Sequence, residues 1–116
     1  MNLAIIGGGP LPLYYTLLDN KLNQLIESSG CYLFTVLCGG VIGQERKEKS
    51  LGELWAKNNG APIMYIFEKT EDKLINQIFL KANYVIFILD GNPNINNIFM
   101  RYKMLGGHGS VIKVQE

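Results

Sequence analysis

Short apolar runs alternate with longer amphipathic segments along the whole chain. The apolar runs are rich in Ile, Val, Phe and Tyr, and they cover residues 3–6, 32–37, 63–67, 84–89 and 111–114. Several of them are apolar almost throughout, a pattern typical of strands that are covered on both faces, as in a parallel sheet. The pattern therefore predicts five buried strands.

The segments between these runs carry apolar residues at helical spacing. Such stripes predict helices over residues 13–28, 71–82 and 94–105. Thr70 is a suitable N-cap for the second of these helices, and Gly106 and Gly107 end the third. A further helix is predicted over residues 44–59, but its first half, QERKEKS, has no apolar stripe. Gly52 in its second half costs about 1 kcal/mol relative to alanine, a cost that close approach to a strand usually offsets.

Strict alternation of strand and helix indicates an α/β fold. We predict a Rossmann-like, doubly wound, five-stranded parallel sheet with right-handed crossovers and the strand order 3-2-1-4-5. Helices would cover both faces, which gives a three-layer α/β/α architecture. The chain has 116 residues, of which 47% are hydrophobic, so it fits a single domain over residues 1–116.

Charge and hydropathy narrow the classes of partner. The formal net charge is +1, with acidic and basic residues interspersed. The chain therefore lacks the positive field expected of a protein that binds duplex nucleic acid or an anionic membrane. No apolar run reaches the roughly 18 residues of a membrane-spanning helix, and the N-terminus lacks the basic region of a signal peptide. We expect a cytoplasmic protein.

The cysteine pattern gives no sign of a disulfide or a metal site. Cys31 and Cys38 fall on one predicted strand, seven residues apart, so their side chains should point to opposite faces. There is no Cys-x-x-Cys pair and no His/Cys cluster that would hold zinc. We expect neither a bound metal nor a cofactor, and reduced thiols.

Glycine-rich loops follow three of the predicted strands. In a doubly wound sheet, ligands bind at the carboxyl ends of the strands. Glycine lets main-chain N–H groups approach an anion, and a helix N-terminus adds a partial positive charge. Short loops of this kind also need glycine for steric reasons alone. The candidate ligand-binding residues of the three loops are Gly7, Gly8 and Gly9, then Gly39, Gly40 and Gly43, and finally Asp90, Gly91 and Asn92.

Two common nucleotide-binding motifs are absent. The first loop, GGGPLP, lacks the third glycine of the dinucleotide fingerprint, and no GK[ST] sequence supplies a Walker A lysine. The sequence thus supports neither an ordinary NAD dehydrogenase nor a P-loop NTPase.

Several short motifs together resemble the SLOG superfamily, which includes the cytokinin-activating phosphoribohydrolases and the DNA-processing protein A type. The chain has IIGGG after the first strand, CGGVIG after the second, LGELWAKNNGAPI in the next helix and turn, and ANYVIFILDGN in a late strand. In the small standalone branch, the matching positions here are Gly39, Gly40, Gly43, Trp55, Ala56, Gly60 and Pro62, with Asn83 in place of the usual Asp.

The resemblance implies a nucleotide or nucleotide-derived ligand. Carried over by position, Gly39, Gly40 and Gly43 would contact phosphate, and residues 7–9 would border the sugar or base. Residues 90–92 would face them from the fourth strand. The chain departs from the hydrolase branch, because DGNPNINN replaces its Pro-Gly-Gly-x-Gly-Thr-x-x-Glu turn.

Several individual residues fit more than one role. Glu45 and Arg46 follow the second glycine turn, where Glu45 would act as a base and Arg46 would clamp a phosphate, but both also fit a solvated charge run. Glu53 is a further candidate for a catalytic carboxylate. Asp90 would bond a ribose hydroxyl or cap the turn that follows it. Tyr14 would stack on a base or pack in the core.

The leading hypothesis is a protein that senses or sequesters a nucleotide, for example a signalling nucleotide, since no acid/base pair is convincingly placed. A compact domain of this kind could act as phage counter-defence proteins do. An N-glycosidase or phosphoribohydrolase that uses Glu45 or Glu53 with Arg46 is the alternative, and a structural or protein-interaction domain is the second alternative.

We also expect a homo-oligomer, namely a dimer, with Trp55 packed against the sheet or a second subunit. His108 should lie at the amino ends of the strands.

Overall fold

The computed structural model describes residues 1–9, 12–30, 33–44 and 50–114. The strands are β1 (Asn2–Gly7), β2 (Thr35–Val41), β3 (Ile63–Glu68), β4 (Tyr84–Leu89) and β5 (Gly109–Lys113). The helices are α1 (Pro12–Ser29), α2 (Leu51–Asn59), α3 (Glu71–Lys81) and α4 (Pro93–Met104). The chain thus alternates strand and helix as its hydrophobic pattern predicts.

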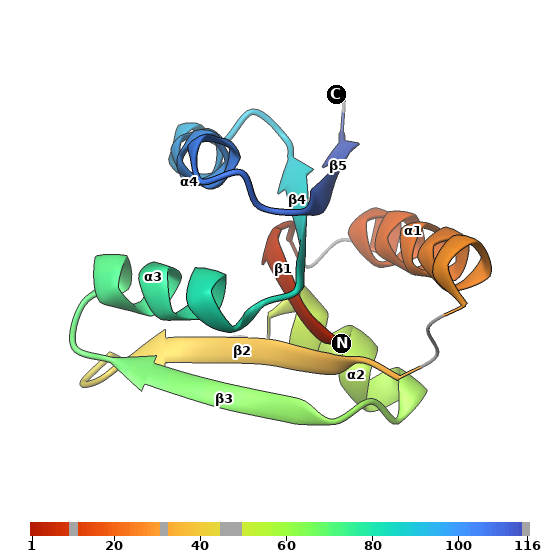
Figure 1. The fold of residues 1–116 in the computed structure, drawn as a ribbon, viewed down its shortest axis with the longest axis horizontal. Coiled ribbons are helices and arrows are strands. Elements are labelled where there is room, and N and C mark those ends of the chain that lie inside the picture. The colour runs from red at the N-terminus through yellow and green to blue at the C-terminus, as the bar shows by residue number, and fades with distance from the viewer. Residues whose placement is uncertain (10–11, 31–32, 45–49, 115–116) are drawn as a thin grey trace.

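All five strands lie parallel in one sheet, in the order β3-β2-β1-β4-β5. This confirms the predicted Rossmann-like, doubly wound arrangement. Helices α1 and α2 pack on one face of the sheet, and α3 and α4 pack on the other (Figure 1). The direction of winding changes between β1 and β4, because α3 carries the chain from the outer strand β3 back across the sheet.

Each face of the sheet has its own apolar core. Strands β1 and β4 contribute to both cores because they are central, and Leu3, Val85, Ile86 and Ile88 are fully buried. An aromatic group of Phe79, Phe87, Phe99 and Tyr102 joins α3 and α4 to β4. These buried runs explain why the sequence of the central strands is apolar on both faces.

Two element boundaries differ from the prediction. Strand β2 begins at Thr35 and extends to Val41, whereas the sequence pattern suggested residues 32–37. The strand continues through two glycines because β3 pairs with it as far as Val41 and Glu68. Cys38 is buried on β2, with its sulfur 3.8 Å from the Ser50 hydroxyl, and Cys31 lies outside the described residues.

Helix α2 is shorter than the helix predicted over residues 44–59. It begins at Leu51, and the side chain of Ser50 caps it by accepting a hydrogen bond from the Glu53 N–H. The explanation for Gly52 is confirmed: a Cβ there would lie 3.2 Å from Ile5 Cδ1 and 3.3 Å from Val36 Cγ1, so glycine allows close helix–strand packing. Thr70 caps α3 as predicted.

None of the helices in the described part of the chain is long and apolar enough to cross a bilayer.

Candidate functional site

The carboxyl ends of β1, β2 and β4 lie at the same edge of the sheet, because these strands run parallel and are neighbours in the strand order. We call the described residues at these ends the carboxyl-end rim, which comprises residues 7–9, 41–43 and 90–92. The rim unites most of the positions that the sequence selects. Gly39 and Gly40 lie just before it, within β2, and are not part of a loop as the sequence suggested.

The sheet parts between β1 and β2 as it approaches this rim. Their pairing ends at Ala4 and Leu37, although β1 continues along β4 to Gly7. Strand β2 likewise continues along β3 to Val41. Figure 1 shows β1 rising away from β2 towards β4. Among the described strands, none pairs with the β1-facing edge of β2 over its last residues.

The hydrogen-bond pattern shows which main-chain groups lie along that edge. Thr35 N–H donates to the carbonyl of Met1, so odd-numbered residues of β2 face β1. Ile42 N–H donates to the carbonyl of Glu68, so even-numbered residues face β3. By this alternation, the main-chain groups of Gly39 and Val41 face the side where β1 has turned away.

The glycine turn after β1 lies between the first turns of α2 and α4. Gly7 and Gly8 have φ values of +96° and +88°, which favour glycine. A Cβ on Gly7 would lie 3.3 Å from Ile95 of α4, and one on Gly8 would lie 2.9 Å from Leu51 of α2. These two glycines thus have a packing role of their own, whether or not a ligand binds.

Three further candidate glycines fall into two groups. A Cβ on Gly39 would lie 2.5 Å from the Ile66 carbonyl oxygen, so that position also needs glycine for packing. Gly43 and Gly91 instead have φ values of +89° and +91°, and a Cβ at either position would have no atom of the described residues within 4 Å. Their conformation requires glycine, and the described residues leave the space beside them open.

Asp90 and its neighbours supply the polar side chains of the rim. The Asp90 carboxylate accepts a hydrogen bond from the Tyr14 hydroxyl at 2.9 Å and from the Asn92 N–H at 3.3 Å. Asn92 caps α4, because its side chain accepts from the Asn94 N–H, and Pro93 is the first residue of the helix. Asp90 therefore caps the turn, one of its two expected roles, and holds the ring of Tyr14 beside Gly9.

Helix N-termini give the rim a partly positive character. Helices α1 and α4 both begin at the rim, and neither has an acidic residue in its first turn. Helix α2 begins there too, but Glu53 lies in its first turn. The positive ends of α1 and α4 are thus not neutralised by a carboxylate of the same helix.

Glu53 occupies a structural position. Its side chain is only 2% exposed, and its carboxylate accepts a hydrogen bond from the Tyr65 hydroxyl at 2.5 Å. Lys57 lies 3.9 Å away on the next turn of α2. A carboxylate held in this way anchors the start of α2 to β3, and it is poorly placed to meet a substrate. Glu45 and Arg46 lie outside the described residues.

Two other singled-out residues lie away from the rim. Trp55 is buried, packs edge-on against Phe34, and donates from Nε1 to Asp19 at 3.1 Å. Trp55 therefore packs within the domain, on the side of α2 that faces the sheet. His108 precedes β5 at the amino ends of the strands, as expected, and its carbonyl accepts from the Tyr102 hydroxyl.

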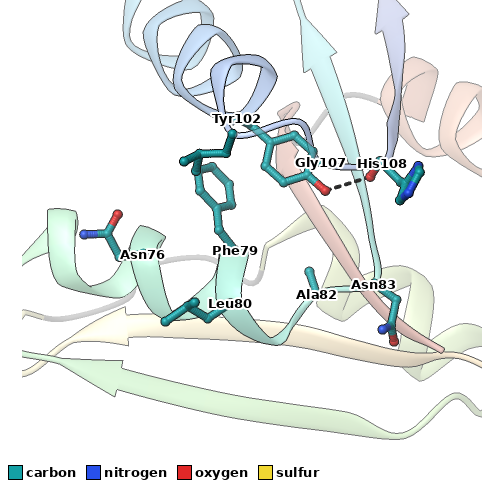
Figure 2. Close-up of a pocket in the computed structure, with 9 residues that line it drawn as sticks. Asn76, Phe79, Leu80, Ala82, Asn83, Tyr102, Gly107 and His108 are labelled. Carbon is teal, nitrogen blue, oxygen red and sulfur yellow. Dashed lines mark hydrogen bonds between the residues drawn. The ribbon is translucent and has the colours of Figure 1, made fainter.

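The structure also contains a pocket that the sequence did not reveal. It has a volume of about 580 Å³ and lies between the C-terminal ends of α3 and α4 (Figure 2). Phe79, Leu80, Tyr102 and Leu105 contribute to its largely apolar lining. Leu80, which lies off the apolar stripe of residues 71–82, was a sequence signal for it, whereas Leu105 fits the stripe of residues 94–105. Its apolar lining suits a phosphate poorly, and it lies at the opposite end of the sheet from the rim.

No protein-family model and no curated protein matches the chain. Within the described ranges, no three His, Cys, Asp or Glu side chains are grouped in a way that could hold a metal ion.

Proposed function

We propose that the protein binds a nucleotide or a nucleotide-derived ligand at the carboxyl-end rim. The proposal depends on one observation: β1 and β2 stop pairing after Ala4 and Leu37, although both strands continue. Main-chain groups of Gly39 and Val41 thus face a side on which the described part of the chain supplies no partner strand, although the Val41 carbonyl already accepts a hydrogen bond from the Gln44 N–H in the turn that follows. In open α/β sheets, ligands bind at such positions beyond the carboxyl ends of the strands.

The helix N-termini of the rim favour an anionic group on the ligand. Those of α1 and α4 carry partial positive charge, of which the nearby Asp90 carboxylate offsets a part. Gly43 and Gly91 leave open space beside the main chain. A phosphate is the anion that this combination suits best.

The polar side chains suit the rest of a nucleotide. The Asp90 carboxylate has acceptor capacity beyond its two hydrogen bonds, which a ribose hydroxyl would use. The ring of Tyr14, held by Asp90 next to Gly9, would lie against the sugar or base. The resemblance of the glycine motifs to the SLOG superfamily supports the same class of ligand.

We favour binding over turnover, so that the protein would sense or sequester its ligand. Of the candidate catalytic groups, Glu53 is buried and bonded to Tyr65. A sequestering role matches that arrangement, because it needs a complementary rim but no acid/base pair.

A binding screen tests the proposal directly. Thermal unfolding would be followed with AMP, ADP-ribose, NAD and cyclic dinucleotides. A ligand present at about 100 times its Kd should stabilise the fold by about 2.7 kcal/mol. A flat melting temperature with every ligand, together with no heat of binding by calorimetry, would refute the proposal.

A matched pair of variants then locates the site. Asp90→Ala should weaken binding about tenfold or more, because it removes the acceptor and a hydrogen bond to a charged group is worth about 1.5–3 kcal/mol. Glu27→Ala removes an exposed charge from the last turns of α1, at the other end of the sheet, and should leave binding unchanged. Equal affinities for the two variants would place the ligand elsewhere. Chromatography of the ligand after incubation separates a binder from an enzyme, since a hydrolase would release free base.

A further inference from the structure

Strand β3 forms one edge of the sheet, and no other described strand pairs with its outer side (Figure 1). On its inner side, the carbonyls of Pro62 and Glu68 accept hydrogen bonds from Val36 N–H and Ile42 N–H of β2. Even-numbered residues of β3 therefore face β2. Because hydrogen-bonding direction alternates along a strand, the N–H and C=O groups of the three odd-numbered residues point outward. These residues are Ile63, Tyr65 and Phe67.

This edge lacks the features that normally keep an edge strand from pairing. Residues 63–67 contain no charged side chain and no proline. Met64, Tyr65 and Phe67 are 41%, 43% and 56% exposed, which is unusual for three large apolar residues in five positions.

The helices leave the edge accessible and also hold it rigid. Helix α2 packs over β2 and β1, so the α2-facing side of β3 extends beyond its cover. On that side the rings of Tyr65 and Phe67 stack at 6.4 Å with an interplanar angle of 11°. The bond from the Tyr65 hydroxyl to Glu53 fixes the stack to α2. A rigid, extended, apolar edge loses little entropy when a further strand pairs with it.

We infer that the edge of β3 pairs antiparallel with the same edge of a second copy of the chain. A two-fold axis at Tyr65 sets Tyr65 opposite its own copy and Ile63 opposite Phe67 in both directions. All of these residues are odd-numbered, so their outward main-chain groups meet in register. Cross-strand pairs of aromatic and β-branched residues are among the favourable ones in sheets.

The same register avoids repulsion between like charges. It places Glu68 opposite Pro62 and Lys69 opposite Ala61, so no like charges face each other across the strands. Ala61 follows Gly60, the left-handed C-cap of α2. Lys69 of one copy would thus lie near the partly negative C-terminus of α2 in the other copy, which is a stabilising arrangement. A second copy supplies both the apolar centre and the flanking charged residues that this register requires. An unrelated strand would not necessarily supply both.

Sedimentation velocity across a wide concentration range tests the inference. The unmodified chain should form a dimer, and Phe67→Lys should weaken it about tenfold or more, since it removes two cross-strand pairs by symmetry. Phe67→Thr keeps β-propensity without a charge and should weaken it in the same direction. Met104→Lys changes an apolar residue of α4 that is 86% exposed, and it should leave the dimer intact. Circular dichroism would confirm that each variant is folded.

A cross-link tests the register itself. Tyr65→Cys places a thiol on the two-fold axis, so a short bifunctional thiol reagent should join two copies. Met104→Cys should not cross-link under the same conditions. A monomer at all concentrations would overturn the inference, and so would a dimer that Phe67→Lys leaves unchanged. None of these outcomes depends on whether a nucleotide binds at the rim.

Discussion

Gly39→Ala is the change for which the structure gives the clearest expectation. Gly39 lies inside β2, opposite Ile66 of β3, and it is covered by Leu74 of α3. A Cβ would lie 2.5 Å from the Ile66 carbonyl oxygen and 2.6 Å from Leu74 Cδ1. Leu74 can move its terminal methyl only within a buried core, and the Ile66 carbonyl can move only if the β2–β3 ladder shifts.

The expected loss of stability follows from three contributions. Overpacking a well-filled core costs about 1–3 kcal/mol. A weakened ladder hydrogen bond adds about 1 kcal/mol. Alanine in place of glycine in a strand returns about 0.5–1 kcal/mol, because the unfolded chain has less freedom. The free energy of unfolding should therefore fall by about 1–3 kcal/mol.

Urea unfolding followed by circular dichroism measures this difference. Gly52→Ala is the matched control, since its Cβ would meet only side chains at 3.2–3.3 Å and alanine favours the helix. That control should stay within about 1 kcal/mol of the unmodified chain. If Gly39→Ala is as stable as the control, the close approach of β2, β3 and α3 is wrong. The main chain of Gly39 faces away from Leu74, so folded Gly39→Ala should still bind a ligand at the rim.

Three further predictions concern a helix cap, a buried hydrogen bond and the titration of a tyrosine. Thr70→Ala should lower the free energy of unfolding by about 1 kcal/mol in urea titrations, because it removes the N-cap of α3; an unchanged midpoint would contradict this cap. Trp55→Phe should cost about 1–2 kcal/mol because Asp19 loses its hydrogen bond from the indole, whereas Asp19→Asn keeps an acceptor and should cost less. Burial, and secondarily the charge of Tyr84, raise the pKa of Tyr102 above its ordinary value of 10.0. Its contribution to stability is therefore complete below the unfolded-state pKa and is lost as pH rises through the higher folded-state pKa. The free energy of unfolding measured in urea titrations should decline as pH rises above 10.0, and Tyr102→Phe should reduce that decline.

The prediction of the fold succeeded where the signal was local and repeated. Alternating apolar strands and striped helices gave the element order, and the right-handed crossover rule then restricted the strand order to few choices. Thr70 was predictable because capping depends on neighbouring residues only. The end of β2 was mispredicted because Gly39 and Gly40 resemble a turn in sequence, while a neighbouring strand and helix hold them extended.

The placement of the candidate loops was predictable, but the surroundings of single residues were not. Parallel strands end at the same edge of a sheet, so the strand order places the loops after β1, β2 and β4 at one edge. Glu53 was a candidate catalytic carboxylate in the sequence, but the structure buries it against Tyr65, which is 12 positions away. The pocket between α3 and α4 likewise arises from the packing of two helices.

The amino-acid sequence by itself determined the kind, order and winding of the elements, because periodicity, caps and crossover handedness act over a few residues or follow from chain connectivity. Only the tertiary structure decided where β1 and β2 part, which glycines serve packing, and which edge of the sheet stays open. Those features depend on distances of a few ångströms between residues that are remote in sequence, and no local pattern encodes them.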